Sequence, residues 1–224
     1  MPPDSTIVDL RRLLAERFGA AMRPRPVSTV PALPTGLDAL DPLVGGGWPR
    51  GEVSELVGEG PGSGTAQVLQ AWIRQTAREG QFLALADGTD SLDLESLEPA
   101  VLTRLLWVRC RGADEALKAA DILLRDRNFS RVVVDLKLCP ATELRRLSSS
   151  VWHRFHRLTE QHGTTALVIT PQPLVSGAAC RVQVRGSLGL QALAQGPVDA
   201  ERGLRFELLR GVAVRGSDLQ EAAG

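Results

Sequence analysis

The chain has 224 residues, of which 43% are apolar, and its acidic and basic side chains balance to a formal net charge of zero. This length suits one larger domain with a sizeable core. A zero net charge argues against strong electrostatic attraction to a polyanion, so we expect DNA binding to be weak or indirect at most. The basic residues are almost all arginine, and we attribute the scarcity of lysine, found only at Lys118 and Lys137, to codon usage.

The cysteine pattern and the N-terminal segment indicate a cellular compartment. Cys110, Cys139 and Cys180 are widely separated and form no C-x-x-C pair, which favours a reducing environment. Asp4 and Asp9 interrupt the stretch where a signal peptide would need an apolar run. No apolar stretch reaches the ~18 residues that span a bilayer. We therefore expect a cytoplasmic protein without membrane contact.

The N-terminal region, residues 1–34, predicts a helix on an extended arm. Residues 4–18 have one apolar face opposite a charged one, as in an amphipathic helix. Four prolines between residues 24 and 34 forbid a helix there and favour a stiff connector. The helix either folds back onto its own domain or docks on another molecule, and both alternatives stay open. The residues expected at a partner contact are Ile7, Leu10, Leu13, Leu14 and Phe18.

From residue 35 to 212 the pattern alternates between strands and helices, and a polar tail follows at 213–224. The alternation predicts a doubly wound, mainly parallel α/β sheet. The last two strands are expected to be antiparallel and to close one edge. Expected strands cover 52–57, 82–87, 105–108, 131–136, 165–170, 181–185 and 204–211, and expected helices cover 65–79, 95–103, 113–126 and 142–161.

A glycine-rich segment, "VGEGPGSGTAQ" from Val57 to Gln67, joins the first of these strands to the first helix. It fits the frame of a phosphate-binding loop, G-x-x-x-x-G-K-[ST], with Ser63 in place of the second glycine and Gly64 in place of the lysine. No basic residue between Arg50 and Arg74 replaces that lysine. Backbone N–H groups could still hold a phosphate, but we favour a turn without ligand. The candidate cofactor-binding residues are Gly58, Gly60, Gly62, Ser63, Gly64, Thr65 and, at the end of the strand "RVVVD", Asp135.

The three histidines fall within ten residues of one predicted helix. His156 and Glu160 have the i,i+4 spacing of a metal site. They lie off the apolar stripe, so we interpret this face as polar surface and expect no metal. With Trp152 close by, Trp152 and His156 are candidates for a protein contact.

The order and spacing of these segments resemble the RecA core. "LPTGLDALDPLVGGGWPRGEVSELVG" is similar to the run that enters the RecA phosphate loop, "AREGQFLALADGTDSLD" to the next strand and acidic loop, and "FSRVVVDL" to the strand that ends in aspartate. The resemblance implies that the family's lysine corresponds to Gly64 and its catalytic glutamate to Thr89. Thr65 and Asp135 keep the two positions that contact magnesium. The Asn-Gln pair that couples nucleotide to DNA corresponds to Thr170 and Pro171.

Length and eroded nucleotide motifs together resemble the ImuA family of RecA-like accessory proteins. That resemblance implies a role in damage-inducible mutagenesis and translesion synthesis, through contacts with RecA and an ImuB-like polymerase-related protein, without catalysis and without a cofactor. Self-association is a further possibility, because Phe18 to Ala21 fits the F-x-x-A pattern that joins some recombinase subunits. Two alternatives remain: a SulA-like inhibitor of cell division, and a weak ATPase whose lysine or arginine comes from a neighbouring subunit.

Overall fold

The computed structural model describes residues 31–186 and 203–211. The predicted N-terminal helix, the C-terminal tail and most of the arm lie outside these ranges. Residues 32–33, which the sequence placed in the arm, form strand β1 (Ala32–Leu33) and pair with β2 (Trp48–Pro49). No helix within the described ranges has the length and apolar character that a membrane span requires.

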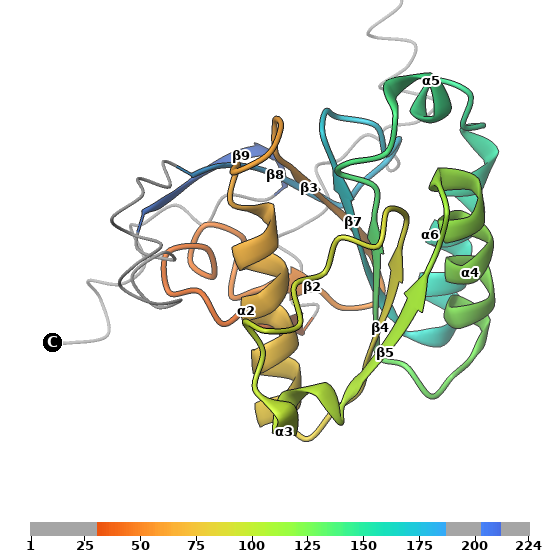
Figure 1. Ribbon diagram of the computed structural model, residues 1–224. Coiled ribbons are helices and arrows are strands. Elements are labelled where there is room, and N and C mark those ends of the chain that lie inside the picture. The colour runs from red at the N-terminus through yellow and green to blue at the C-terminus, as the bar shows by residue number, and fades with distance from the viewer. Residues whose placement is uncertain (1–30, 187–202, 212–224) are drawn as a thin grey trace, which may run out of the picture.

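A seven-stranded sheet forms the centre of the molecule, in the order β5-β4-β6-β7-β3-β8-β9 (Figure 1). Neighbouring strands are parallel except for β8 and β9, which are antiparallel, as the sequence predicts. The strands are β3 (Val53–Val57), β4 (Leu83–Asp87), β5 (Leu105–Arg109), β6 (Arg131–Asp135), β7 (Thr165–Thr170), β8 (Cys180–Gly186) and β9 (Leu204–Arg210).

Helices cover both faces of the sheet, which confirms the doubly wound α/β class. Helix α2 (Thr65–Arg78) lies on one face, and α4 (Ala113–Arg125) and α6 (Ser150–His162) lie on the other (Figure 1). The two remaining described helices, α3 (Pro99–Leu102) and α5 (Ala141–Leu144), are single turns.

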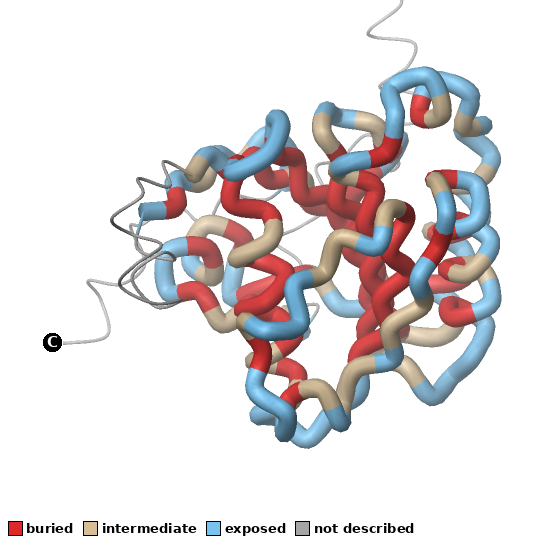
Figure 2. The backbone as a smooth tube through the Cα atoms, in the orientation of Figure 1, coloured by how far each residue is buried: buried red, intermediate tan, exposed pale blue. Residues whose placement is uncertain are grey.

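Each face of the sheet carries its own apolar core, because successive side chains of a strand point to opposite faces. In β6, Val133 packs with the cluster under α2, whereas Val132 and Val134 pack with the cluster under α4 and α6. The central strands are therefore buried on both sides, which explains their continuous apolar sequences (Figure 2). On the α2 side, the rings of Trp48 and Trp72 meet edge to face at 6.4 Å.

Two predicted helices differ in the structure. The helix predicted at 142–161 is split into α5 and α6 by residues 145–149, where the Ser148 hydroxyl accepts a hydrogen bond from Ser150 N (3.3 Å). Serine side chains compete in this way with helical backbone bonds. The helix predicted at 95–103 shrinks to α3, because Pro99 is tolerated only in a first turn.

The placement of Trp152 at a protein contact was wrong. Its side chain is 2% exposed and packs edge to face on Phe155, with ring centroids 6.0 Å apart. The buried residues of α6 are Trp152, Phe155, Leu158 and Thr159. Trp152 is therefore part of the core beneath α6.

Candidate functional site

The parallel register brings the carboxyl ends of β3, β4, β6 and β7 to one edge of the sheet. Val57 lies opposite Thr170, and Asp87 lies opposite Asp135. Ligand sites of open α/β sheets form at this edge. We divide it into a loop side, made of residues 58–65 with β8 and β9, and an acidic side, made of the ends of β4 and β6.

On the loop side, the glycine-rich segment forms the predicted strand–loop–helix unit. Gly58 N donates to Thr170 O (3.0 Å), and α2 begins at Thr65. Residues 59–62 are exposed, whereas Ser63, Gly64 and Thr65 are buried. The six candidate loop residues therefore lie together between β3 and α2, as the sequence predicts.

The position of the family's lysine, Gly64, faces apolar side chains. Its backbone is left-handed, with φ at 97°, a conformation that favours glycine. A Cβ added here would collide with Leu204 Cδ2 and lie 3.2 Å from Val184 Cγ2. Leu204 and Val184 belong to β9 and β8 and are themselves 6% and 1% exposed. Residues far away in the sequence thus fill the space into which a side chain at position 64 would extend.

The end of β8 also lies against the loop backbone. A Cβ on Gly186 would be 3.0 Å from Gly62 O and 3.3 Å from Gly64 N. Any larger residue at this position would crowd the loop backbone more tightly than most side-chain contacts in proteins do. The one charged side chain of the loop, Glu59, accepts a hydrogen bond from Gln183 Nε2 of β8 (3.1 Å). An acidic group here makes the loop less favourable for an anion.

On the acidic side, Asp87 ends β4 and is fully buried. It accepts backbone hydrogen bonds from Thr89 (3.2 Å), Ser91 (2.7 Å) and Leu92 (3.0 Å). The indole Nε1 of Trp107 on β5 adds a fourth donor at 3.3 Å. Asp87 is therefore held by uncharged donors of its own chain.

Asp135 ends β6 and is 1% exposed. Lys137, two residues later, donates its backbone N–H to Asp135 Oδ1 (3.1 Å) and its ammonium to Oδ2. The same ammonium donates to Ser91 Oγ at 2.9 Å. Burial raises the pKa of the Asp135 carboxyl, and the adjacent Lys137 opposes that shift. Sequence analysis missed Lys137, although a lysine is rare in this chain and this one follows a strand-ending aspartate.

The loop after β4 carries the position of the family's catalytic glutamate. Thr89 stands there, and its hydroxyl is buried without a hydrogen-bond partner among the described residues. Asp90, next to it, points instead to β5, where Arg109 Nε donates to Asp90 Oδ1 (2.6 Å). The Arg109 guanidinium holds the pKa of the Asp90 carboxyl below its usual value.

Glu55, in the middle of β3, is a buried charge that sequence analysis also missed. Its Oε1 accepts from Thr170 Oγ1 (2.9 Å) and from the backbone N–H groups of Leu174 (2.6 Å) and Val175 (3.0 Å). Its Oε2 pairs with Arg181 of β8. Thr170 is where the resemblance places the family's coupling pair, so Glu55 fastens that position to β3 and β8. The available signal was a glutamate in the middle of a segment that the sequence predicts to be a strand, 52–57.

The remaining predicted contact residues divide into two groups. His156 is half-buried, and its Nε2 lies 3.0 Å from Ser176 O. The predicted contact residues at 7–18 lie outside the described residues. No cluster of metal-ligating side chains occurs within 31–186 and 203–211.

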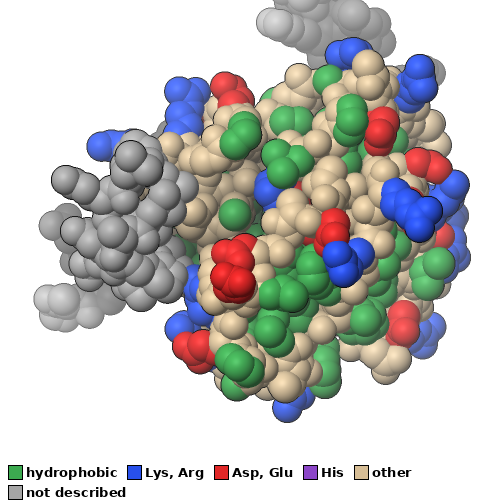
Figure 3. Space-filling view, viewed as in Figure 1, with side chains coloured by type: hydrophobic (Ala, Val, Ile, Leu, Met, Phe, Trp, Pro, Cys, Tyr) green, Lys and Arg blue, Asp and Glu red, His purple; other side chains and the backbone are tan. Residues whose placement is uncertain are grey.

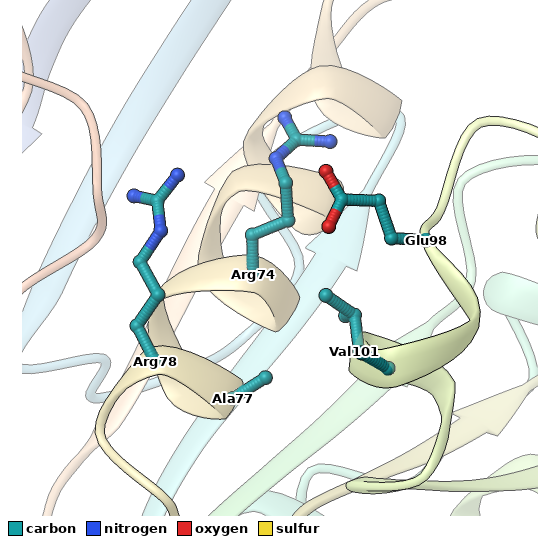
Figure 4. A pocket seen from close by; sticks show the side chains of 6 residues that line it. Arg74, Ala77, Arg78, Glu98 and Val101 are labelled. Atoms are coloured by element: carbon teal, nitrogen blue, oxygen red, sulfur yellow. The ribbon is translucent and has the colours of Figure 1, made fainter.

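A pocket of about 220 Å³ lies away from this edge, between α2 and α3. Figure 4 shows Glu98 extending toward Arg74, with Ala77 and Val101 below them. Arg74 and Arg78 project from the second half of α2, far along the helix from the loop. The pocket is therefore separate from the residues that the sequence singled out.

Comparisons with known proteins agree with this arrangement. The chain is 33% identical to a plasmid RecA of Lactococcus lactis over 120 residues, 51% of this chain and 35% of that protein. It is 28% identical to the RecA of Streptomyces avermitilis over 185 residues, 74% of this chain and 48% of that protein. It is 31% identical to the RecA of Salinispora tropica over 170 residues, 67% of this chain and 49% of that protein.

The core is RecA-like. The similarity to the Streptomyces avermitilis RecA extends over 74% of this chain, and the sheet has the α/β topology that the resemblance implies. The chain spans about a third to a half of the length of these RecA relatives. No protein-family model matches it. The RecA-like core is thus a distant relative of these RecA proteins.

Proposed function

We propose that this protein is a non-catalytic RecA-like accessory factor that acts by protein contact. Its partners would be a RecA-type protein, an ImuB-like polymerase-related protein, or both, in the mutagenesis that follows DNA damage. The observation that carries the proposal is the packing of Leu204 and Val184 against Gly64. The lysine position of a RecA-like core is here part of the apolar interior.

The chemistry of the site supports the absence of turnover. Loss of one preorganised group typically lowers a rate by about 10²–10³-fold. Here the lysine position holds Gly64 and the glutamate position holds Thr89, whose hydroxyl cannot act as a base for water. The glycine-rich loop, residues 58–65, contains no basic side chain, and its Glu59 adds a negative charge.

One outermost strand of the sheet, β5, supports a contact function; its outer side is called the β5 edge. Among the described residues, β5 pairs only with β4, so one side of its backbone can bind another strand. Leu106 of β5 is 41% exposed, and Leu94 before it is 39% exposed. Figure 3 shows hydrophobic side chains gathered over β5 and the segment before it. Such a surface fits a protein partner better than a polyanion.

The experiment that tests the proposal combines turnover with strand exchange. The purified protein should show no ATP turnover above the background of Asp135→Asn, and it should lower RecA strand exchange at near-stoichiometric ratios. Turnover at the rate of a recombinase that Asp135→Asn abolishes would contradict the non-catalytic role. Failure to bind a RecA-type or ImuB-like protein, together with unchanged damage-induced mutation after deletion of the gene, would contradict the mutagenesis role.

The β5 edge gives the contact proposal a sharper prediction. Leu106→Lys should weaken partner binding about tenfold, because it places a charge in an apolar contact and costs about 1.4 kcal/mol. Ile122→Lys is the matched control, since Ile122 is an exposed apolar residue (68%) that lies on α4 and not on β5. Binding to immobilised RecA-type and ImuB-like proteins is the measurement. Equal binding by both variants would exclude the β5 edge as the contact, and would leave residues 4–18 as the remaining prediction.

A further inference from the structure

The acidic side of the sheet edge has two carboxylates that could bind a metal cation, and it also contains the ammonium of Lys137. Asp87 and Asp135 face each other on adjacent strands and are 0% and 1% exposed. Carboxylate oxygens at such a place are the ligands that magnesium prefers. Two buried like charges side by side are unfavourable unless something compensates them. The structure shows how each of the two is compensated.

Asp87 needs no cation. Its two oxygens accept backbone hydrogen bonds from three residues of the following loop and one from Trp107 Nε1. A carboxylate that accepts this many hydrogen bonds is stable in its charged form. Its acceptor sites are directed at the protein's own N–H groups and not at an open coordination position.

Asp135, in contrast, is held by a full positive charge. The Lys137 ammonium contacts Asp135 Oδ2 and Ser91 Oγ, and the Lys137 side chain is only 12% exposed. An ammonium is a compact point charge with three donors. Because Lys137 follows Asp135 by two residues, the pair requires no distant part of the fold. Ser91 in turn donates its N–H to Asp87, so the ammonium connects both strand ends.

We infer that the Lys137 ammonium occupies the place of a divalent cation, so that the acidic side binds no magnesium. A metal–nucleotide complex does not fit here, since the metal would have to displace a shielded ion pair at Asp135. The loop side adds a second mismatch, because Leu204 of β9 and Val184 of β8 cover Gly64. This inference rests on the proposed non-catalytic function and extends it to the metal.

The test is a titration of the full-length protein with Mn²⁺ alone. Calorimetry measures binding, and the thermal unfolding midpoint measures the effect of Mn²⁺ on stability. Wild type should bind no Mn²⁺ in the millimolar range and should keep its midpoint. Lys137→Ala leaves Asp135 uncompensated, so it should bind Mn²⁺ at least about tenfold more tightly and recover stability as Mn²⁺ is added. Lys137→Gln keeps a donor without the charge and provides a second variant if Lys137→Ala does not fold without metal.

Lys118→Ala is the matched control. Lys118 is the only other lysine, and it forms an exposed i,i+4 ion pair with Asp114 on α4. Its variant should behave like wild type. If wild type binds Mn²⁺ as tightly as both Lys137 variants, or if neither variant gains binding, the inference is wrong.

The outcomes also separate this inference from the proposed function, because the titration contains no nucleotide and no partner. Mn²⁺ binding by wild type without ATP turnover would overturn the inference and leave the proposed function standing. A gain of Mn²⁺ binding in Lys137→Ala alone would support the inference even if no RecA-type partner is found.

Discussion

The loop side and the acidic side of the same sheet edge have been closed by different kinds of interaction. On the loop side, apolar side chains from β8 and β9 pack against Gly64. On the acidic side, Lys137 forms an ion pair with Asp135. Apolar packing fills a volume and tolerates no added side chain, whereas an ion pair depends on charge and can be opened by a single neutral substitution. The comparison teaches that one half of the edge is closed by shape and the other half by charge.

Arg181→Met should lower the free energy of unfolding more than any other variant proposed here. It also tests how far charge contributes to stability on the loop side. Removing one partner of a buried pair leaves an uncompensated charge and typically costs about 3–5 kcal/mol. Glu55 is fully buried, and Arg181 is its only charged partner among the described contacts. We expect the free energy of unfolding in urea to fall by this amount. Adding Glu55→Gln should recover part of the loss, and a double variant as unstable as Arg181→Met would contradict the ion-pair explanation.

Gly64→Lys tests closure by shape. The substitution restores the family's lysine in sequence, but it forces a side chain into a left-handed backbone and against Leu204. We expect a loss of about 2–4 kcal/mol in the free energy of unfolding and no gain of ATP turnover.

Gly62→Lys is the control for that experiment. Gly62 is also left-handed, with φ at 77°, but no atom lies within 4 Å of an added Cβ. Only the backbone cost of about 1–2 kcal/mol should remain. If the two lysine variants are equally stable, Leu204 and Val184 do not fill the position, and the comparison between the two sides fails.

The last expected effect is a pH dependence that comes from Cys180 at the start of β8. Burial raises the pKa of the Cys180 thiol from 9.0 to about 12. Above pH 9 the unfolded chain therefore loses a proton that the folded protein keeps. The free energy of unfolding should fall as the pH rises from 9 toward 12, and should be unaffected below 9. Urea denaturation should show a shallower slope against pH for Cys180→Ala than for wild type, while an identical slope would show that this thiol is not buried in solution.

Much of the fold could be predicted because its signals are local. The apolar strands ending in Asp87 and Asp135 and the buried stripe of α2 follow from hydrophobic periodicity, and the structure confirms them. The break between α5 and α6 was missed because its only signal is a short run of serines. Serine side chains compete with helical hydrogen bonds, but a run of serines is a weak indication of a helix end. Trp152 stands three residues before Phe155 on the same buried face of α6, so its place in the core was also a local signal, and it was missed.

The site was less predictable because its decisive contacts join distant residues. The absence of lysine at Gly64 was visible in the sequence, but the packing of Leu204 against it depends on how β9 joins the sheet. The role of Lys137 was local and could have been found, yet the rarity of lysine was attributed to codon usage. A lysine that follows a strand-ending aspartate indicates an ion pair at that place, even where the scarcity of lysine in the chain reflects codon usage.

The two kinds of closure also differ in when they can form as the chain is synthesised. Lys137 follows Asp135 by only two residues, so their pair needs little loop-closure entropy and can form as soon as β6 joins its neighbours. Leu204 lies in β9, the last strand along the chain among the described residues, and reaches Gly64 only after almost the whole sheet has been made. Contacts of such long sequence separation form slowly. A nascent chain would therefore neutralise its acidic side first, while its glycine-rich loop stays uncovered until β8 and β9 arrive.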